Sequence, residues 1–209
     1  MFTGLVQSMG SIAAIQPTQT GLRLLIDARP WAHSPAAGDS ISLNGCCLTL
    51  ASPPATTQGL WAFDAVPETL AKTTLGRLKA GSRVNLEHAA TASTLMGGHM
   101  VQGHVDGVGA VLSVQTTPEY RVRVRPPPDL MEFLSPKGSV CLEGVSLTIA
   151  ALNPMEDWFE VALIPMTLEK TTLAALHADD ECNVEADSMA KTIVHWLRHY
   201  GEQARDKDS

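Results

Sequence analysis

Short segments in which apolar and polar residues alternate, or in which apolar residues run together, recur along most of the chain. Six segments have this pattern: 21–27, 40–43, 47–50, 60–63, 120–125 and 158–164. Gly- or Pro-rich stretches follow several of them, as expected for β-strands separated by turns. Pro67 and Pro165 each begin a short segment and suit the first turn of a helix. The pattern predicts a β-rich protein with two short helical turns.

Residues 188–200 have a helical pattern instead. Ser188 is a suitable N-cap and Gly201 directly follows the segment. One narrow stripe along the predicted helix contains its large apolar residues, Met189, Ile193, Trp196, Leu197 and Tyr200. The stripe can pack against the rest of the chain or against other copies of the helix, and its narrow, coiled-coil-like form favours self-association.

His195 and His199 lie four residues apart on this helix, a spacing that can bind a metal ion. No third ligand is suitably placed nearby in the sequence, and Arg198 adjoins both histidines. The sequence therefore favours a solvated helix face and predicts no metal site.

The chain repeats itself with an offset of 99 residues, which becomes 98 further along. Segment 38–50 recurs as 137–149, and segment 67–75 recurs as 165–173. Matching blocks in the same order indicate a duplicated domain, and about six short strands per copy predict a small closed barrel or a sandwich. We expect one copy in residues 1–97, a second in 98–187, and a C-terminal helix and tail in 188–209.

Composition narrows the class of protein. Hydrophobic residues make up 44% of the 209 positions, which excludes a disordered chain, and no window approaches the length of a membrane-spanning helix. The net charge of −7 disfavours binding to nucleic acid. The N-terminus lacks the features of a signal peptide, and the four cysteines then suggest reduced thiols. We expect a cytoplasmic protein with no membrane partner.

The two copies differ at positions that carry chemistry. Leu5, Asn44 and Cys47 in the first copy correspond to His104, Glu143 and Ser146 in the second. Drift after duplication can produce any one such pair. Three pairs that each involve a reactive or ionisable group favour a site that holds two similar ligands in different chemical roles. The glycines of segment 97–109 match neither a P-loop nor a dinucleotide fingerprint, which disfavours a nucleotide cofactor.

Several motifs closely resemble the riboflavin synthase family, whose members are trimers of a two-repeat chain. They are Met1-Phe2-Thr3-Gly4, the segments 43–49, 97–107 and 144–148, and the two proline-led segments 67–70 and 163–168. The resemblance covers essentially the whole chain. It implies an all-β fold of two six-stranded closed barrels of Greek-key type followed by a C-terminal α-helix, and a homotrimer formed through that helix.

The resemblance also implies an activity. Members of the family are transferases that convert two molecules of 6,7-dimethyl-8-ribityllumazine into riboflavin and 5-amino-6-ribitylamino-pyrimidinedione, by moving a four-carbon unit from one to the other. No metal ion or organic cofactor takes part. Each repeat binds one lumazine, and the active site forms between the first repeat of one subunit and the second repeat of its neighbour.

By position, the resemblance assigns residues to two substrate pockets. The first pocket would use Gly4, Leu5, Val6, Cys47, Leu48, Thr49, Asp64, Ala65, Val66, Pro67, Glu68 and Thr69. The second would use Gly103, His104, Val105, Lys137, Ser146, Leu147, Thr148, Ala162, Leu163, Ile164, Pro165, Met166 and Thr167. Phe2 would stack near the ligands at the interface between the repeats, and Glu143 and Asp187 would orient the ribityl chain or His104.

Three of these residues would be catalytic. His104 suits proton transfer because the ordinary histidine pKa is about 6.5. Cys47 would act as a transient nucleophile or a proton carrier, and Ser146 as a positioning hydroxyl. The second repeat departs from the common family pattern at Glu143, at Met166 and in segment 179–182.

Two functions from different classes follow. The first is a riboflavin synthase, which the presence of Cys47, His104 and Ser146 favours. The alternative is a non-catalytic lumazine- or flavin-binding paralogue on the same pair of barrels, such as an optical antenna or carrier. A two-barrel oxidoreductase fragment is disfavoured because no nucleotide-binding segment is present.

Overall fold

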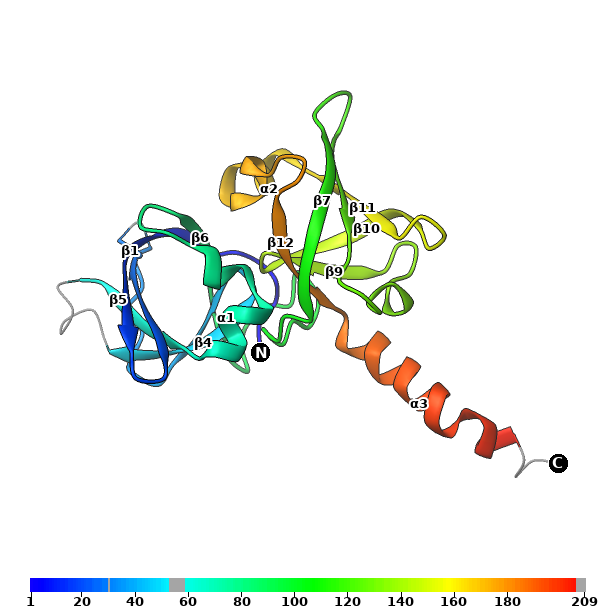
Figure 1. The fold of residues 1–209 in the computed structure, drawn as a ribbon, viewed down its shortest axis with the longest axis horizontal. Coiled ribbons are helices and arrows are strands. Elements are labelled where there is room, and N and C mark those ends of the chain that lie inside the picture. The colour runs from blue at the N-terminus through cyan, green and yellow to red at the C-terminus, as the bar shows by residue number, and fades with distance from the viewer. Residues whose placement is uncertain (30, 53–58, 206–209) are drawn as a thin grey trace.

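The protein contains two closed six-stranded antiparallel β-barrels followed by a long helix (Figure 1). Residues 1–29, 31–52 and 59–205 are described by the computed structural model. The first barrel consists of β1 (Ser8–Thr18), β2 (Gly21–Asp27), β3 (Ser40–Leu43), β4 (Cys46–Ser52), β5 (Trp61–Ala65) and β6 (Arg83–His88). The second consists of β7 (Gly107–Gln115), β8 (Tyr120–Arg125), β9 (Ser139–Leu142), β10 (Val145–Asn153), β11 (Trp158–Leu163) and β12 (Glu181–Ala186).

Equivalent strands occupy equivalent places in the two barrels. Neighbouring strands of the first barrel run β1-β2-β5-β4-β3-β6 and close back on β1, and the second barrel has the same cyclic order in its own numbering. The expected fold, two six-stranded closed barrels with a C-terminal helix, is confirmed. Closure pairs every strand on both sides and leaves no exposed sheet edge in either barrel.

Alternating apolar side chains fill each barrel. Leu24 and Ile26 on β2 are fully buried, as are Val122 and Val124 on β8, because every second residue of a strand faces the same side. A short helix and a 3₁₀ turn follow the fifth strand of each copy, namely α1 (Pro67–Lys72) with η2 (Thr74–Arg77), and α2 (Pro165–Lys170) with η4 (Thr172–Ala175). A further 3₁₀ turn, η3 (Met131–Phe133), lies between β8 and β9.

Two tight turns bring the barrels into backbone contact. Asn44 and Gly45 join β3 to β4, Glu143 and Gly144 join β9 to β10, and all four residues have positive φ, as a type I′ hairpin requires. A Cβ atom added at Gly144 would lie 2.7 Å from the backbone nitrogen of Gly45, and one at Gly45 would lie 2.8 Å from that of Gly144. Glycine is therefore needed in both turns for the close approach as well as for the conformation.

Buried asparagines reinforce this contact in a reciprocal way. Asn85 on β6 donates from Nδ2 to the Glu143 carbonyl at 2.8 Å, and Asn183 on β12 donates to the Asn44 carbonyl at 2.8 Å. The Oδ1 atoms of the same two side chains accept from the backbone nitrogens of Thr172 and Thr74, respectively. Each asparagine thus connects its own barrel with two segments of the other.

The third helix, α3 (Ser188–Arg205), extends away from both barrels (Figure 1). Gly201, expected just beyond the helix end, lies inside it, and residues 206–209 of the expected tail lie outside the described residues. Ion pairs from Lys191 to Asp106 and from Arg198 to Glu132 connect α3 to the second barrel. The apolar stripe predicted along the helix is exposed at Met189, Ile193, Trp196, Leu197 and Tyr200.

Of the helices in the described part of the chain, none is both long enough and apolar enough to cross a membrane.

Replacing Gly144 with alanine should lower the free energy of unfolding by about 2–4 kcal/mol. Positive φ costs an L-residue about 1–2 kcal/mol, and the added methyl would be forced against the Gly45 backbone. Gly81→Ala is the matched control, since Gly81 has a φ of +89° but no heavy atom within 4 Å of the added Cβ. Urea unfolding should show a loss of about 1–2 kcal/mol for the control. Equal losses in the two variants would contradict the turn contact.

The stability contributed by Glu143 should depend on pH. Burial raises the pKa of this carboxyl from 4.5 to about 7, so its protonated form is favoured in the folded state. The stabilisation is fully present below pH 4.5 and is lost as the pH rises through 7. A shift of this size corresponds to about 3 kcal/mol. The free energy of unfolding of the unsubstituted protein should therefore fall by about 3 kcal/mol from this group between pH 4.5 and pH 8. Glu143→Gln should not show this loss, so its stability relative to the unsubstituted protein should rise by about 3 kcal/mol over the same range.

Urea unfolding at the two pH values measures this difference. Glu169→Gln, which removes an exposed carboxylate on α2, is the control. Its free energy of unfolding should change with pH as that of the unsubstituted protein does. Parallel behaviour of Glu143→Gln as well would show that Glu143 does not titrate with a raised pKa.

Two candidate ligand-binding pockets

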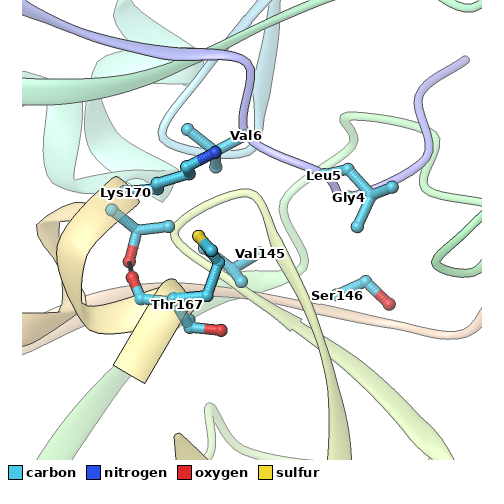
Figure 2. A pocket seen from close by; sticks show the side chains of 9 residues that line it. Gly4, Leu5, Val6, Val145, Ser146, Thr167 and Lys170 are labelled. Atoms are coloured by element: carbon cyan, nitrogen blue, oxygen red, sulfur yellow. Dashed lines mark hydrogen bonds between the residues drawn. The ribbon is translucent and has the colours of Figure 1, made fainter. Parts of the chain in front are cut away.

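Each barrel has a pocket beside its short helix, and the two pockets are built from equivalent residues. The first-barrel pocket has a volume of about 280 Å³ and is lined by Cys46, Cys47, Glu68, Thr69, Lys72, Thr73, Gly103, His104 and Val105. The second-barrel pocket has a volume of about 190 Å³ and is lined by Gly4, Leu5, Val6, Val145, Ser146, Met166, Thr167, Lys170 and Thr171 (Figure 2). All nine positions of one pocket correspond to those of the other at an offset of 98 or 99 residues.

The segment that completes each pocket comes from the other copy. Residues 4–6 precede the first barrel but line the second-barrel pocket, and residues 103–105 precede the second barrel but line the first-barrel pocket. The Gly4 carbonyl accepts a hydrogen bond from the Ser146 nitrogen at 2.8 Å, and the Gly103 carbonyl accepts one from the Cys47 nitrogen at 2.8 Å. We refer to residues 2–6 and 101–105 as the crossing segments.

This exchange corrects the expected grouping of residues. The sequence analysis placed Gly4, Leu5 and Val6 with Cys47, and Gly103, His104 and Val105 with Ser146, whereas each triplet lies in the opposite pocket. The physical reason is the path of the backbone, since the two crossing segments pair with each other. The Phe2 nitrogen donates to the Val101 carbonyl at 2.7 Å, and the Val101 nitrogen donates to the Phe2 carbonyl at 3.1 Å.

Cys47 and His104 therefore lie in the same pocket. Cys47 is half-buried on β4, and His104 is exposed on the crossing segment. The neighbouring thiol of Cys46 faces the barrel interior, where burial raises its pKa to about 12, with smaller contributions from Cys47 and Glu185. Cys46 is thus held as a neutral thiol, and Cys47 is the thiol accessible to a ligand.

Ser146 of the second-barrel pocket is hydrogen-bonded to a histidine, His99, which is not among the residues that line the pocket and which the sequence analysis did not assign. The Nδ1 atom of His99 lies 2.7 Å from the Ser146 hydroxyl. Burial lowers the pKa of His99, and its Nε2 atom is buried without a hydrogen-bond partner among the described residues. Nδ1 accepts a hydrogen bond from the Ser146 hydroxyl when the ring proton is on Nε2, and donates one when the ring proton is on Nδ1. The available signal was that segment 97–107 contains two histidines, of which His99 is the first and lies five residues before His104.

The two pockets also differ in charge. In the first-barrel pocket, Lys72 forms an ion pair with Glu68 at 3.0 Å. In the second, Met166 occupies the position equivalent to Glu68, and Lys170 has no ion-pair partner in the described part of the chain. The second-barrel pocket therefore carries an uncompensated positive charge on its helix.

Several residues expected at the site lie outside both pockets. Leu48 and Leu147 point into the barrel cores, whereas Thr49, Thr148 and Lys137 are exposed on their strands and turn. In the first copy, Asp64 on β5 is paired with Arg23 at 2.7 Å. Ala65 is buried at the end of β5, Val66 is exposed, and Pro67 is the first residue of α1. In the second copy, a neighbouring cavity of about 460 Å³ is lined in part by Ala162, Leu163, Ile164 and Pro165.

Three further expected residues lie between the barrels or beside α3. Phe2 is fully buried at the interface with Val101 and Cys141, so its ring is not available to stack on a ligand. Glu143 is buried in the turn contact, where a carboxyl oxygen accepts from the Asn183 nitrogen at 2.6 Å instead of facing a pocket. Asp187 is half-buried at the start of α3 and accepts from the Met189 nitrogen at 2.8 Å.

None of the described His, Cys, Asp and Glu side chains forms a group of three or more that could hold a metal ion. His195 and His199 lie side by side on α3, with ring centroids 4.6 Å apart. The first-barrel pocket offers a thiol, an imidazole and a lysine. The second-barrel pocket offers a lysine and the Ser146 hydroxyl, which is hydrogen-bonded to the imidazole of His99.

Comparison with known proteins agrees with this architecture. The family described as "Lumazine binding domain" matches residues 3–89 and again residues 102–187. Riboflavin synthase from Mycobacterium tuberculosis (strain ATCC 25618 / H37Rv) is 37% identical over 203 residues, covering 96% of this chain and 100% of that protein. Riboflavin synthase from Chlamydia pneumoniae is 36% identical over 199 residues, covering 95% of this chain and 96% of that protein.

Solved structures show the same pair of barrels. The crystal structure of LumP complexed with riboflavin has a TM-score of 0.78 and 28% identity, covering 89% of this chain and 99% of that chain. LumP complexed with 6,7-dimethyl-8-(1'-D-ribityl) lumazine has a TM-score of 0.77 and 26% identity, with the same coverage. The duplicated barrels, the paired pockets and these likenesses show that the chain belongs to the riboflavin synthase family, with two lumazine-binding domains.

Proposed function

We propose that each pocket binds one molecule of 6,7-dimethyl-8-ribityllumazine and that the chain converts such a pair into riboflavin and 5-amino-6-ribitylamino-pyrimidinedione. One observation carries the proposal: nine equivalent positions line two equivalent pockets, while the reactive groups within them differ. Pockets with equivalent linings suit two identical ligands. Different reactive groups suit a dismutation, in which one ligand donates the four-carbon unit and the other accepts it. A protein that only bound lumazine would need no such difference.

The reaction moves a four-carbon unit between two copies of one compound. The atoms of two lumazines equal those of the two products, so the transfer needs no external oxidant or reductant. The pteridine ring makes the protons of its 7-methyl group acidic and accepts the electrons that deprotonation releases. The protein then contributes mainly proximity and proton transfer, and oriented intramolecular reactions reach effective molarities of about 10⁵ M or more.

The residues divide these tasks between the pockets. In the first-barrel pocket, His104 transfers protons to and from the ligand, and Cys47 acts as the adjacent nucleophile or proton carrier. In the second-barrel pocket, Ser146 is the positioning hydroxyl, and its hydrogen bond to His99 orients it toward the ligand. These roles combine the observed geometry with the roles carried over from the family.

We further propose a homotrimer in the cytoplasm, in which residues 1–97 and 98–187 are the two lumazine-binding domains and 188–209 associate between subunits. Two observations support the assembly. The apolar stripe of α3 is exposed, and α3 extends away from the barrels (Figure 1). The complete active site would then join the first-barrel pocket of one subunit to the second-barrel pocket of its neighbour.

The activity is tested by incubating the purified protein with 6,7-dimethyl-8-ribityllumazine and following riboflavin absorbance. His104→Ala should lower kcat by about 10²–10⁴-fold, the usual contribution of a positioned acid–base group. Cys47→Ser should lower it as well, by a smaller factor, because a hydroxyl keeps the hydrogen-bonding ability of the thiol but is the weaker nucleophile. His177→Ala, at an exposed histidine outside both pockets, is the control and should match the unsubstituted protein.

Two results would contradict these roles. Full turnover by His104→Ala would remove His104 from the mechanism. Saturable lumazine binding by the unsubstituted protein with no riboflavin formed would identify a binding protein instead of an enzyme.

The assembly is tested on the α3 stripe. The double substitution Ile193→Glu and Leu197→Glu places charge on the exposed apolar stripe and should reduce the mass in solution from three chains to one. Light scattering after size-exclusion chromatography measures the mass. His195→Glu, at an exposed position off the stripe, should leave three chains. An unchanged mass in the double variant would show that α3 does not hold subunits together.

A further inference from the structure

Two buried carboxylates hold the crossing segments in place. Glu87 on β6 and Glu185 on β12 occupy equivalent positions, and their side chains are 3% and 2% exposed. Neither residue lines the first-barrel or the second-barrel pocket. Within the described part of the chain, the side-chain hydrogen bonds of both residues run to the crossing segments.

The two sets of contacts mirror each other. Glu87 accepts at Oε1 from the Thr3 nitrogen and the Thr3 hydroxyl, both at 2.7 Å, and at Oε2 from the Gly4 nitrogen at 3.0 Å. Glu185 accepts at Oε1 from the Gln102 nitrogen at 2.7 Å and at Oε2 from the Gly103 nitrogen at 3.0 Å. Each carboxylate binds two successive backbone amides, one with each oxygen.

The peptide held by each carboxylate touches the other barrel. Gly4, held by Glu87 of the first barrel, accepts from Ser146 of the second at 2.8 Å. Gly103, held by Glu185 of the second barrel, accepts from Cys47 of the first at 2.8 Å. The next residue along each segment, Leu5 or His104, then enters the pocket of that other barrel.

The fit allows little movement of either segment. A Cβ atom added at Gly4 would lie 2.6 Å from the Ser146 Cβ, and one added at Gly103 would lie 2.6 Å from the Cys47 Cβ. Because the segments already touch the residues that carry the reactive groups, a displaced segment also displaces the pocket wall. Misplacement by about 1 Å can cost about 10²-fold in rate.

A carboxylate is the group that this arrangement requires. An ionised carboxylate offers only acceptors, whereas a glutamine of the same shape directs two N–H donors from one of its terminal atoms. In either site, one end of a glutamine amide would therefore face a backbone N–H with another donor. Burial raises the pKa of both carboxyls, and the backbone hydrogen bonds oppose that effect.

We propose that Glu185 and Glu87 are positioning residues that act across the barrel interface. Glu185, anchored in the second barrel, sets His104 against Cys47 in the first-barrel pocket, and Glu87, anchored in the first barrel, sets Gly4 and Leu5 against Ser146 in the second-barrel pocket. The proposal rests on the proposed function for the identity of the ligand and for the catalytic roles of His104 and Cys47.

The test uses Glu185→Gln and Glu87→Gln in the full-length protein, with Glu169→Gln as the control for the loss of one carboxylate outside both pockets. Backbone amide NMR signals of Cys47 and Ser146 report on the two contacts. Glu185→Gln should shift the Cys47 signal and leave the Ser146 signal in place, and Glu87→Gln should do the reverse. A purely structural role for each glutamate in its own barrel would not produce this crossed pattern.

Kinetics provide the second measurement. Both glutamine variants should lose about 10- to 100-fold in kcat/KM for riboflavin formation, and only Glu185→Gln should also shift the pH profile, because only it displaces His104. The shorter carboxylate in Glu185→Asp should restore part of the activity, while Glu169→Gln should match the unsubstituted protein.

The outcomes separate the two proposals. If the unsubstituted protein binds lumazine without forming riboflavin, the proposed function fails, although the crossed NMR shifts can still appear. If the unsubstituted protein forms riboflavin and each glutamine variant perturbs only its own barrel, or neither the signals nor the rate changes, the positioning role is overturned. If a glutamine variant does not fold, the crossed shifts are measured in its aspartate counterpart, where their absence contradicts the proposal.

Discussion

Reciprocal backbone contact between the two copies is the constraint on which the rest of the structure depends. The turns at Gly45 and Gly144 approach so closely that neither admits a side chain, and the crossing segments pair at Phe2 and Val101. Cys46 and Val145 come directly after these turns, so the strands that carry Cys47 and Ser146 begin at the contact. The position of each reactive group is therefore set by the meeting of the two barrels, and neither copy closes its own pocket.

The two copies share their backbone structure but differ in the side chains at equivalent positions. Asn44 and Glu143 both present a side-chain oxygen to a backbone nitrogen of the last strand, Asn85 in one copy and Asn183 in the other. The amide does this without charge, whereas the carboxyl does it at the cost of burying an ionisable group. The same backbone structure thus accommodates different side chains wherever the hydrogen-bond geometry is retained.

Much of the fold follows from patterns in the sequence. Segments 21–27 and 120–125 coincide with β2 and β8 because their alternating residues face a barrel interior on every second position. No strand was predicted over Ser8–Thr18 or Gly107–Gln115, and in both the register shifts partway along, between Ile12 and Ala14 and between Val111 and Ser113. A bulge moves the apolar residues out of strict alternation, which removes the signal of a strand.

The grouping of residues into the two pockets could not be predicted from the repeat. An offset of 99 residues shows that Gly4 and Gly103 are equivalent, but it does not show which barrel each one faces. That depends on the path of the backbone between the copies, which hydrogen bonds distant in sequence determine. His99 was not assigned to the site for a related reason. Its counterpart, 99 residues earlier, would precede Met1, so comparison of the two copies shows no difference at this position.

Fusion of the two copies in one chain explains why the pockets differ. If two separate identical chains exchanged their N-terminal segments in this way, both pockets would contain the same residues. In a single chain, each crossing segment diverges independently, so that His104 and Cys47 line one pocket while Leu5 and Ser146 line the other. A dismutation requires one of two identical substrates to give what the other receives. Two pockets with equivalent backbones but different reactive side chains supply that difference. The carboxylates of Glu87 and Glu185 hold the crossing segments that complete the two pockets.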